Sequence, residues 1–308
     1  MKIVVTGGAG FIASHVVDGY VARGHEVFVI DNLSSGEKKN LNPKATLYSM
    51  DVVDPKLPGV IGEIRPDVLN HHAAQIDVRR SVSDPVFDAK VNVLGFLNLL
   101  EAGRTAGVKK VIFSSSGGAI YGDQEKFPAP EEHPTRPASP YGVSKLTGEN
   151  YLVYYHATFG IPYIALRYAN VYGPRQSFRG EAGVIAIFID QLLSGNTPVI
   201  NGDGEQTRDY VYVGDVAAAN MLALDSSFVG SVNIGTGVET DLNALYTKLA
   251  AGLRSKVAPI HGAAKEGEQR RSVLDAARAK KILGWTPKTS LDQGLADTID
   301  FYRKAKAS

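Results

Sequence analysis

The sequence predicts an α/β fold, in which a doubly wound parallel sheet is joined to a smaller C-terminal α/β domain. Two features of the first half predict the sheet. Short β-branched runs alternate there with stretches of helical spacing, which is the order of parallel strands and crossover helices. The runs are also apolar throughout, as strands covered on both faces need to be. The second domain is predicted because 308 residues exceed the roughly 100–200 residues of a usual single domain.

The elements of the first half follow from these two patterns in order. Ile3–Val5 is a predicted strand, and Phe11–Arg23 is the helix after it. The further predicted strands are Glu26–Ile30, Val68–Asn70, Val111–Phe113 and Ile164–Arg167. Two long helices are predicted from apolar residues at helical spacing, Pro85–Ala106 and Tyr141–Phe159, and Gly160 ends the second of them.

After about Asn170 the pattern becomes less regular. The predicted elements are a helix at Ile185–Leu193, a short strand at Pro198–Asn201, two strands returning to the main sheet at Asp209–Val213 and Ser231–Ile234, a helix after Thr240, a strand near Val257–Ile260 and a last helix from near Leu291. Because the chain returns to the main sheet, the predicted domain boundary is discontinuous. Residues 1–172, with returning segments at about 208–236, form the first domain, and 173–207 with 237–308 form the second.

Composition excludes several classes of function. Lys plus Arg number 33 against 32 for Asp plus Glu, so no global field attracts nucleic acid or an anionic membrane. The chain has no cysteine, which excludes disulfides, a thiol nucleophile and a cysteine metal site. No signal peptide is predicted, and the longest apolar run, Ala182–Ile189, is far shorter than the ~20 residues of a membrane span. We therefore expect a soluble, cytoplasmic protein.

We also expect no metal site. His71 and His72 are adjacent, so in a strand their side chains point to opposite faces. No cluster of carboxylates or cysteines accompanies them in the sequence. A structural role, or a place at the edge of a cofactor, is therefore predicted for this pair.

The segment from Thr6 to Ala13, Thr-Gly-Gly-Ala-Gly-Phe-Ile-Ala, lies between the first strand and the first helix. Glycines are needed where the backbone turns sharply and approaches a pyrophosphate, which then rests on the helix N-terminus. Asp31 ends the second strand, 18 residues after Ala13, near the ~20 typical of a carboxylate that binds the adenosine ribose. Such a carboxylate repels a 2′-phosphate. The sequence thus predicts a Rossmann-type domain that binds NAD rather than NADP.

Two features near this turn leave alternatives open. Lys38 and Lys39 lie close enough in sequence to leave NADP as the alternative cofactor. Asp51 and Val52 follow another short strand and are candidates for an adenine contact, with a solvated loop aspartate as the alternative.

Tyr141 and Lys145 are four residues apart, hence on one face of the predicted helix. A free phenol has a pKa of about 10 and is a poor base at neutral pH. A neighbouring ammonium group and a cationic nicotinamide would lower the pKa of Tyr141 and favour its phenolate. The alternative is a surface Tyr and Lys that merely share a helix. The strand end Ser114-Ser115-Ser116 upstream favours the catalytic interpretation.

Together these features resemble the extended short-chain dehydrogenase/reductase family over essentially the whole chain. The resemblance implies that Ser116, with Ser115 as the alternative, hydrogen-bonds the reacting oxygen, and that Tyr141 is the catalytic base. It implies that Lys145 also binds the nicotinamide ribose. The positions it implies for a tightly bound NAD are Gly7, Gly10, Phe11, Ile12, Asp31, Asn32, Ser35, Gly36, Asp51, Val52, Ala73, Ala74, Gln75, Asn92, Ser114, Tyr141, Lys145, Tyr168 and Val171.

Within this family, residues 73–81, 168–175 and 202–210 resemble segments of UDP-glucose (UDP-galactose) 4-epimerases. The substrate contacts that this implies are Ser116, Tyr141, Asn170, Val184, Val199, Asn201, Arg208, Lys265 and Glu268. Arg208 would grip the diphosphate, a role suited to a permanent cation with forked donors. Its alternative is a surface ion pair with Asp209.

The sequence also departs from these epimerases. Lys265 stands where they commonly carry a second diphosphate-binding arginine, and Arg270 and Arg271 are nearby substitutes or merely charges on a solvated loop. Ser272 occupies a position that is bulky in epimerases restricted to unacetylated sugars. A small residue there should leave room for an N-acetyl group.

The resemblance implies that UDP-glucose and UDP-galactose are interconverted by oxidation at C4, rotation of the 4-keto sugar and re-reduction. The rivals are a UDP-glucuronate 4-epimerase, a nucleotide-sugar dehydratase or decarboxylase, and a non-catalytic NAD-binding protein. Dehydratases and decarboxylases normally carry acidic residues after the catalytic Ser or Thr, where this chain has Gly117-Gly118. Non-catalytic relatives commonly lose the Tyr or Lys. A homodimer through the outer sides of the two long helices is also implied.

Overall fold

The computed structural model describes residues 1–178, 183–264 and 269–307. Its main sheet has seven strands, all parallel, in the order β10-β6-β5-β4-β1-β2-β3. They are β1 (Lys2–Thr6), β2 (Glu26–Asp31), β3 (Thr46–Ser49), β4 (Val68–His71), β5 (Lys110–Ser116), β6 (Tyr163–Tyr168) and β10 (Gly230–Ile234). The strand order reverses direction between β1 and β4. The prediction of a doubly wound parallel sheet is therefore confirmed.

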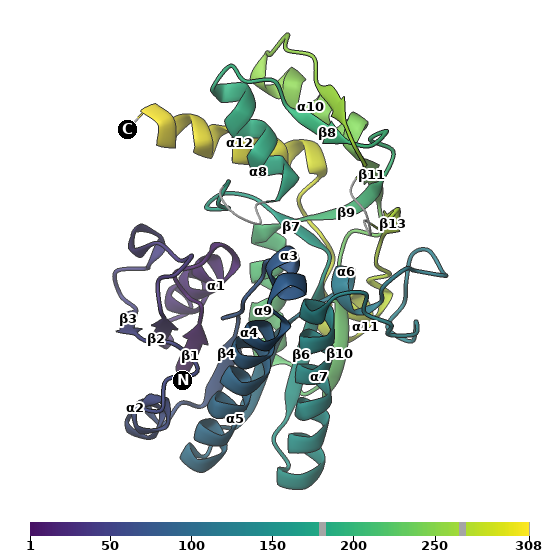
Figure 1. Ribbon diagram of the computed structural model, residues 1–308. Helices are drawn as coiled ribbons and strands as arrows, with labels where there is room; N and C mark the ends of the chain where they lie inside the picture. The colour runs from purple at the N-terminus through teal and green to yellow at the C-terminus, as the bar shows by residue number, and fades with distance from the viewer. Residues whose placement is uncertain (179–182, 265–268, 308) are drawn as a thin grey trace.

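Helices cover both faces of this sheet (Figure 1). One face packs on α1 (Phe11–Ala22), α9 (Val213–Asp225) and α11 (Ala277–Leu283), and the other on α2 (Leu57–Ile64), α5 (Gly95–Ala106) and α7 (Pro140–Phe159). Within β1, Ile3 and Val5 belong to the first core and Val4 to the second. The continuous apolar runs in the sequence are thus explained, because alternate residues of each strand enter a different core.

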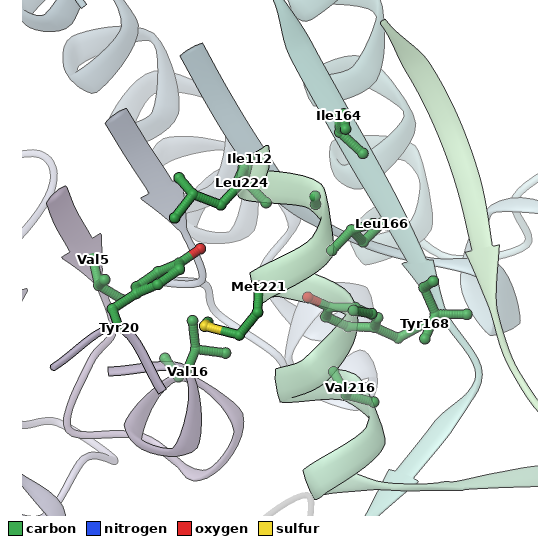
Figure 2. Close-up of a cluster of buried hydrophobic side chains, with 14 of the residues drawn as sticks. Val5, Val16, Tyr20, Ile112, Ile164, Leu166, Tyr168, Val216, Met221 and Leu224 are labelled. Carbon is green, nitrogen blue, oxygen red and sulfur yellow. The ribbon is translucent and has the colours of Figure 1, made fainter. Parts of the chain in front are cut away.

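Figure 2 shows the core between the sheet and helix α9. The hydroxyl ends of Tyr20 and Tyr168 both point toward this helix. Asn220 on α9 donates to the Tyr168 hydroxyl at 2.8 Å, and Asn70 of β4 donates to the Tyr20 hydroxyl at 2.8 Å. The polar ends of two large buried side chains are therefore paired, as buried hydroxyls need to be. Helix α9, which joins these groups, was not predicted from the sequence.

The predicted helix at 85–106 is interrupted. It consists of α4 (Pro85–Ala89), a π-turn labelled η2 (Lys90–Leu94) and α5, and the short helix α3 (Val78–Ser83) precedes it. Asn92 lies inside the π-turn, where its side chain accepts from the Gln75 backbone N–H at 2.8 Å and donates to the Gln75 carbonyl at 2.9 Å. The predicted helix is thus confirmed in its bounds, and the π-turn within it was not predicted. Such π-turns are frequent at functional sites.

The remaining elements form a second sheet and a third core. The second sheet contains β7 (Asn170–Tyr172), β9 (Thr207–Tyr212), β11 (Glu239–Asp241) and β13 (Arg271–Ser272). The third core involves α8 (Val184–Leu193), β8 (Val199–Asn201), α10 (Leu242–Leu253) and α12 (Leu291–Ala307), and β8 pairs with β12 (Ile260–Gly262). In Figure 1 these helices lie beyond the carboxyl ends of the main strands. The predicted domain boundaries themselves stay a prediction.

Two strand predictions need correction. The strand predicted at 209–213 does not return to the main sheet, because β9 pairs with β7, β11 and β13. The strand predicted near 257–260 begins only at Ile260, because Pro259 has no N–H to donate and the pairing starts with the bond from Ile260 N to the Pro198 carbonyl, 3.0 Å long. The strand predicted at 231–234 is confirmed by β10.

Two short helical elements complete the fold, η1 (Lys38–Asn40) and α6 (Gly117–Ile120). None of the helices in the described part of the chain is both long and apolar enough to cross a membrane.

Candidate active site

The glycine-rich turn lies where the strand order reverses, between β1 and β4. Gly7 has a φ of +71°, and a Cβ on it would lie 2.8 Å from the Ala73 backbone nitrogen. Only glycine permits both that conformation and that approach. Helix α1 then begins after Gly10 with no side-chain cap and with no acidic residue in its first turn. Its N-terminal N–H groups and positive dipole end are therefore available to an anion such as a pyrophosphate.

Asp31 supports this turn. Its buried carboxylate accepts from the Ala9 N–H at 2.9 Å and from the Leu33 N–H at 2.7 Å. The loop after β2 folds back over the turn, since a Cβ on Gly36 would lie 2.9 Å from the Ala9 Cβ. Asn32 donates to Asp51 at 2.7 Å, which joins the end of β2 to the segment after β3. The predicted contacts of Asp31 with a ribose and of Asp51 with an adenine remain predictions.

The predicted dinucleotide residues all lie at the carboxyl ends of the main strands, or on the helices that border them. They lie in the last residues of a strand or after it: β1 (Gly7, Gly10, Phe11, Ile12), β2 (Asp31, Asn32, Ser35, Gly36), β3 (Asp51, Val52), β4 (Ala73, Ala74, Gln75), β5 (Ser114) and β6 (Tyr168, Val171), with Asn92 in η2 and Tyr141 and Lys145 on α7. Ligands of doubly wound sheets bind at this edge, where the strand order reverses. The residues present therefore fit a dinucleotide.

Helix α7 positions the predicted proton-transfer pair. Ser139 caps the helix by accepting from the Gly142 N–H at 3.2 Å, and Tyr141 and Lys145 follow one turn apart. The Lys145 Nζ donates to the Ser114 carbonyl at 2.8 Å and lies 5.8 Å from the centre of the Tyr141 ring. A Cβ on Gly142 would lie 2.6 Å from the Ala119 carbonyl oxygen, so the first turn of α7 packs directly on α6.

Ser116 lies at the N-cap of α6, and this packing therefore brings it close to the start of α7. Ser115, the alternative, is buried and donates to the Glu149 Oε1 at 2.5 Å. Adjacent strand residues point to opposite faces, so Ser116 does not share that contact. The structure thus assigns Ser115 to a buried network. The predicted role of Ser116 stays a prediction.

Burial controls the ionisation of this pair. It lowers the pKa of Lys145 to about 8, although the negative charge of Asp88 acts in the opposite direction. Burial also raises the pKa of Tyr141 above its usual value near 10, and Asp88 acts in the same direction. The predicted lowering of the Tyr141 pKa required both Lys145 and a cationic nicotinamide, and Lys145 by itself does not produce it. The phenolate would need a further positive charge, such as a nicotinamide ring, within the site.

A second group of predicted residues lies on the neighbouring sheet. Asn170 on β7 is exposed, and Ser272 on β13 is directly opposite Arg208 on β9. A methyl group placed on Gly118 would lie 3.8 Å from the Ser272 Oγ and 4.0 Å from the Asn170 Oδ1. The second sheet thus presents these side chains next to α6, on which Gly118 follows Ser116 by two residues.

Arg208 is held by main-chain acceptors. Its Nη1 donates to the Thr207 carbonyl at 2.8 Å and to the Gln269 carbonyl at 2.9 Å. The carboxylate of Asp209 is buried and accepts from the backbone and hydroxyl of Thr236 and from the Gly237 N–H. Asp209 therefore serves as a buried acceptor rather than as half of a surface ion pair.

The other predicted substrate residues are dispersed. Val184 begins α8, and Val199 and Asn201 lie on β8. Lys265 and Glu268 lie outside the described residues. Their suggested substitutes, Arg270 and Arg271, form exposed ion pairs: Arg270 with Asp203 at 2.7 Å and Glu205 at 2.8 Å, and Arg271 with Glu239 at 2.7 Å.

His71 and His72 point to opposite faces, as predicted. The His71 ring stacks on Phe96 with centroids 4.6 Å apart, and its Nδ1 lies 2.8 Å from the Thr6 Oγ1. The His72 ring is 6.2 Å from that of Tyr168, on the other side of the sheet. Burial lowers the pKa of His71 well below its usual value and that of His72 to about 3, with the charge of Lys145 acting in the same direction. Both rings are therefore neutral at physiological pH.

A buried ion pair that was not predicted from the sequence lies next to this site. Glu149 lies one turn after Lys145 on α7, and its carboxylate accepts from Arg167 of β6 at 2.6 and 3.0 Å. Ser115 and Ser231 also donate to Glu149, the latter at 2.8 Å. The four-residue spacing from Tyr141 to Lys145 to Glu149 was the available signal. The pair fixes α7 to the strand beside it.

Known proteins share both the sequence and the fold of this chain. The profile of the NAD dependent epimerase/dehydratase family matches residues 3–235. UDP-glucose 4-epimerase from Mycolicibacterium smegmatis is 46% identical, covering 98% of this chain and 99% of that protein. The crystal structure of UDP-glucose 4-epimerase with UDP-glucose from Thermotoga maritima is 47% identical with a TM-score of 0.98, covering 99% of this chain and 100% of that one. The Thermus thermophilus UDP-glucose 4-epimerase complex with NAD is 43% identical with a TM-score of 0.94, at 99% and 100% coverage.

These similarities extend over nearly the whole chain, including both sheets and the helices beyond them. They agree with the resemblance carried by the glycine-rich turn and by the Tyr141–Lys145 pair. The chain belongs to the NAD dependent epimerase/dehydratase family, within the extended short-chain dehydrogenases/reductases.

Proposed function

We propose that the chain is a UDP-glucose 4-epimerase that retains its NAD and interconverts UDP-glucose and UDP-galactose. The observation that carries this proposal is the grouping of Ser116, Tyr141 and Lys145 at the carboxyl edge of the main sheet, beside a pyrophosphate-type glycine turn. The similarity to epimerases solved with UDP-glucose and with NAD supports it.

Each residue has a defined part in this reaction. NAD, when bound, supplies the group that accepts hydride from C4 and returns it. Tyr141 takes the proton from the O4 hydroxyl and later gives it back, which is general base and then general acid catalysis. Ser116 donates a hydrogen bond to the same oxygen. The ammonium group of Lys145 stabilises the phenolate electrostatically. Arg208 holds the diphosphate. The 4-keto sugar can therefore rotate within the site while the diphosphate remains anchored.

The residues after Ser116 favour epimerisation over elimination or decarboxylation. Helix α6 has the sequence Gly-Gly-Ala-Ile and thus offers no acidic side chain. A dehydratase or decarboxylase would be expected to place one there to drive loss of water or carbon dioxide. The presence of both Tyr141 and Lys145 likewise disfavours a non-catalytic NAD-binding protein.

The test is conversion of UDP-galactose to UDP-glucose by the purified full chain without added NAD. We expect turnover, since the net redox change is zero and the cofactor is retained. A parallel assay with UDP-glucuronate distinguishes the nearest rival. Turnover of UDP-glucuronate alone would replace the proposed substrate, and no turnover of either sugar would contradict an epimerase.

We further propose that the enzyme accepts N-acetylated sugars. Ser272 is small and lies beside Gly118 and Asn170, where bulkier side chains would narrow the space next to α6. We expect the wild-type protein to convert UDP-GlcNAc to UDP-GalNAc, and Ser272→Tyr to lose this conversion while keeping UDP-galactose turnover. Product ratios measured by chromatography check this, and a wild type inactive on UDP-GlcNAc would contradict it.

We also propose a homodimer through the two long helices. Figure 1 shows α4, α5 and α7 side by side on one face of the molecule. These helices and the π-turn η2 carry exposed apolar residues that a monomer would leave in water, namely Val86, Leu94, Val143 and Val153. Val86 is the most exposed of them, at 78%.

Val86→Glu is expected to convert the dimer to a monomer, because it places an unpaired charge in the apolar contact. In the free chain the same glutamate would remain in water and cost little. Sedimentation velocity measures the change, with Ile260→Glu as the control, since Ile260 is exposed on β12, away from these helices. A monomeric wild-type protein would contradict the proposal.

A further inference from the structure

Helix α4 carries a buried carboxylate, Asp88, that no predicted role includes. The side chain is fully buried. Its Oδ2 accepts from the Ser144 hydroxyl at 2.6 Å, and its Oδ1 accepts from the Asn92 amide at 3.0 Å and the Gln75 amide at 3.1 Å. These donors are neutral, so the negative charge has no cation among its hydrogen-bond partners within the described residues. Burying an unpaired charge is costly, which indicates that the charge itself has a use.

The three donors come from the elements that border the predicted proton-transfer site. Ser144 directly precedes Lys145 on α7, Asn92 lies in the π-turn η2, and Gln75 follows β4. Asp88 is therefore held against the catalytic helix at a fixed position. Its charge acts on both Tyr141 and Lys145, and it raises the pKa of each.

The other titratable groups around Lys145 supply no countercharge. His71 and His72 at the end of β4 are neutral, since burial and Lys145 itself lower their pKa values. Tyr141 on α7 is un-ionised in the chain alone, and the contacts of Lys145 with β5, to the Ser114 carbonyl and the face of the Phe113 ring, carry no net charge. Among the described residues, Asp88 is the acidic group whose charge acts on Lys145.

We propose that Asp88 is a positioning residue that keeps Lys145 protonated through its charge, acting through space and not by direct contact. Without that charge, burial alone would determine the ionisation of Lys145, and the ammonium group would be lost at lower pH. The consequence for turnover rests on the proposed function. The effect on Lys145 itself does not.

Asp88→Asn removes the negative charge of the side chain while keeping its shape. The remaining carbonyl oxygen can accept from Asn92 and Gln75 as Oδ1 does now. The new amide nitrogen can donate to the Ser144 oxygen, because a hydroxyl both donates and accepts. All three contacts are thus compatible with the variant. Ser144→Ala is the matched control, since it removes one hydrogen bond to Asp88 and leaves the charge in place.

The direct test is an NMR titration of the purified full chain carrying 13C at lysine Cε, with the Lys145 signal identified by its absence from Lys145→Met. We expect Asp88→Asn to lower the apparent pKa of Lys145 by about one unit or more, the size of effect that one nearby opposite charge produces. Ser144→Ala should not lower it. An unshifted Lys145 titration in folded Asp88→Asn, or an equal fall in Ser144→Ala, would overturn the proposal.

The second measurement is the pH dependence of kcat/KM for UDP-galactose. Because a lower pKa means that the ammonium group is lost at lower pH, the alkaline limb of Asp88→Asn should move to lower pH, with Ser144→Ala retaining the wild-type limb. A uniform fall in rate at every pH, with the limb unmoved, would show a merely structural role and overturn the proposal. Since the NMR titration needs no substrate, an inactive wild type would contradict the proposed function without deciding the role of Asp88.

Discussion

Tyr141→Phe is expected to lower kcat for UDP-galactose by about 10²–10⁴-fold, the contribution typical of a positioned general acid–base group. The substitution removes only the hydroxyl that would take and return the O4 proton. Within the described part of the chain, no residue forms a hydrogen bond with this hydroxyl. Tyr141 lies one helical turn before Lys145, and its ring is close to the Lys145 ammonium group. The loss should therefore fall on turnover and not on folding.

Steady-state kinetics with UDP-galactose measure this loss, and thermal unfolding checks that the fold persists. Tyr151→Phe is the matched control, because Tyr151 lies on the same helix but packs against the hydrophobic core between the main sheet and helices α2, α5 and α7. It should retain wild-type kcat. A Tyr141→Phe protein that keeps kcat within tenfold of the wild type would show that another group moves the proton.

The features whose positions in the fold were predicted correctly from the sequence are those encoded over short stretches. The turn around Gly7, the carboxylate of Asp31 and the four-residue spacing of Tyr141 and Lys145 are all local patterns. Each has one backbone geometry that it favours, so its place at the strand edge followed once the main strands were recognised. The main sheet was predictable for the same reason, because strands covered on both faces carry continuous apolar runs.

The features that were missed depend on partners distant in sequence. β9 reads as a buried strand, but its membership of the second sheet is decided by pairing with β7, β11 and β13. The π-turn at Asn92 depends on the Gln75 backbone, which reaches it from the loop after β4. The sequence assigned no role to Asp88. Only the packing of α4 on α7 shows that it is buried beside the predicted proton-transfer pair.

The ionisation of Tyr141 likewise depends on burial, which the sequence does not show. The sequence displays charges but not burial, so only the ammonium group of Lys145 and a cationic nicotinamide entered the prediction. In the structure, desolvation raises the pKa of Tyr141 and outweighs any help from that neighbour. In the proposed reaction, the Tyr141 phenolate therefore requires positive charge beyond that of Lys145, such as a cationic nicotinamide.

Among the proposed substitutions, Arg167→Met is expected to cause the largest decrease in the free energy of unfolding. It leaves the Glu149 carboxylate buried without its cation, and breaking a buried ion pair in this way costs about 3–5 kcal/mol. Arg167 also donates to the Tyr121 hydroxyl at 2.9 Å and to the Glu131 carbonyl at 3.2 Å, so further acceptors lose a partner. For a chain of this size we expect the melting temperature to fall by roughly 10 °C.

Two further variants decide whether the unpaired charge is the cause. Arg23→Met removes an exposed pair with Asp225 and should cost less than about 1 kcal/mol. The double variant Arg167→Met/Glu149→Leu removes both buried charges and should regain part of the lost stability, because no buried carboxylate is then left unpaired. Denaturant unfolding of the four proteins, wild type included, gives the free energy of unfolding of each. If the double variant is no more stable than Arg167→Met, the cost comes from lost packing around β6 and not from the isolated charge of Glu149.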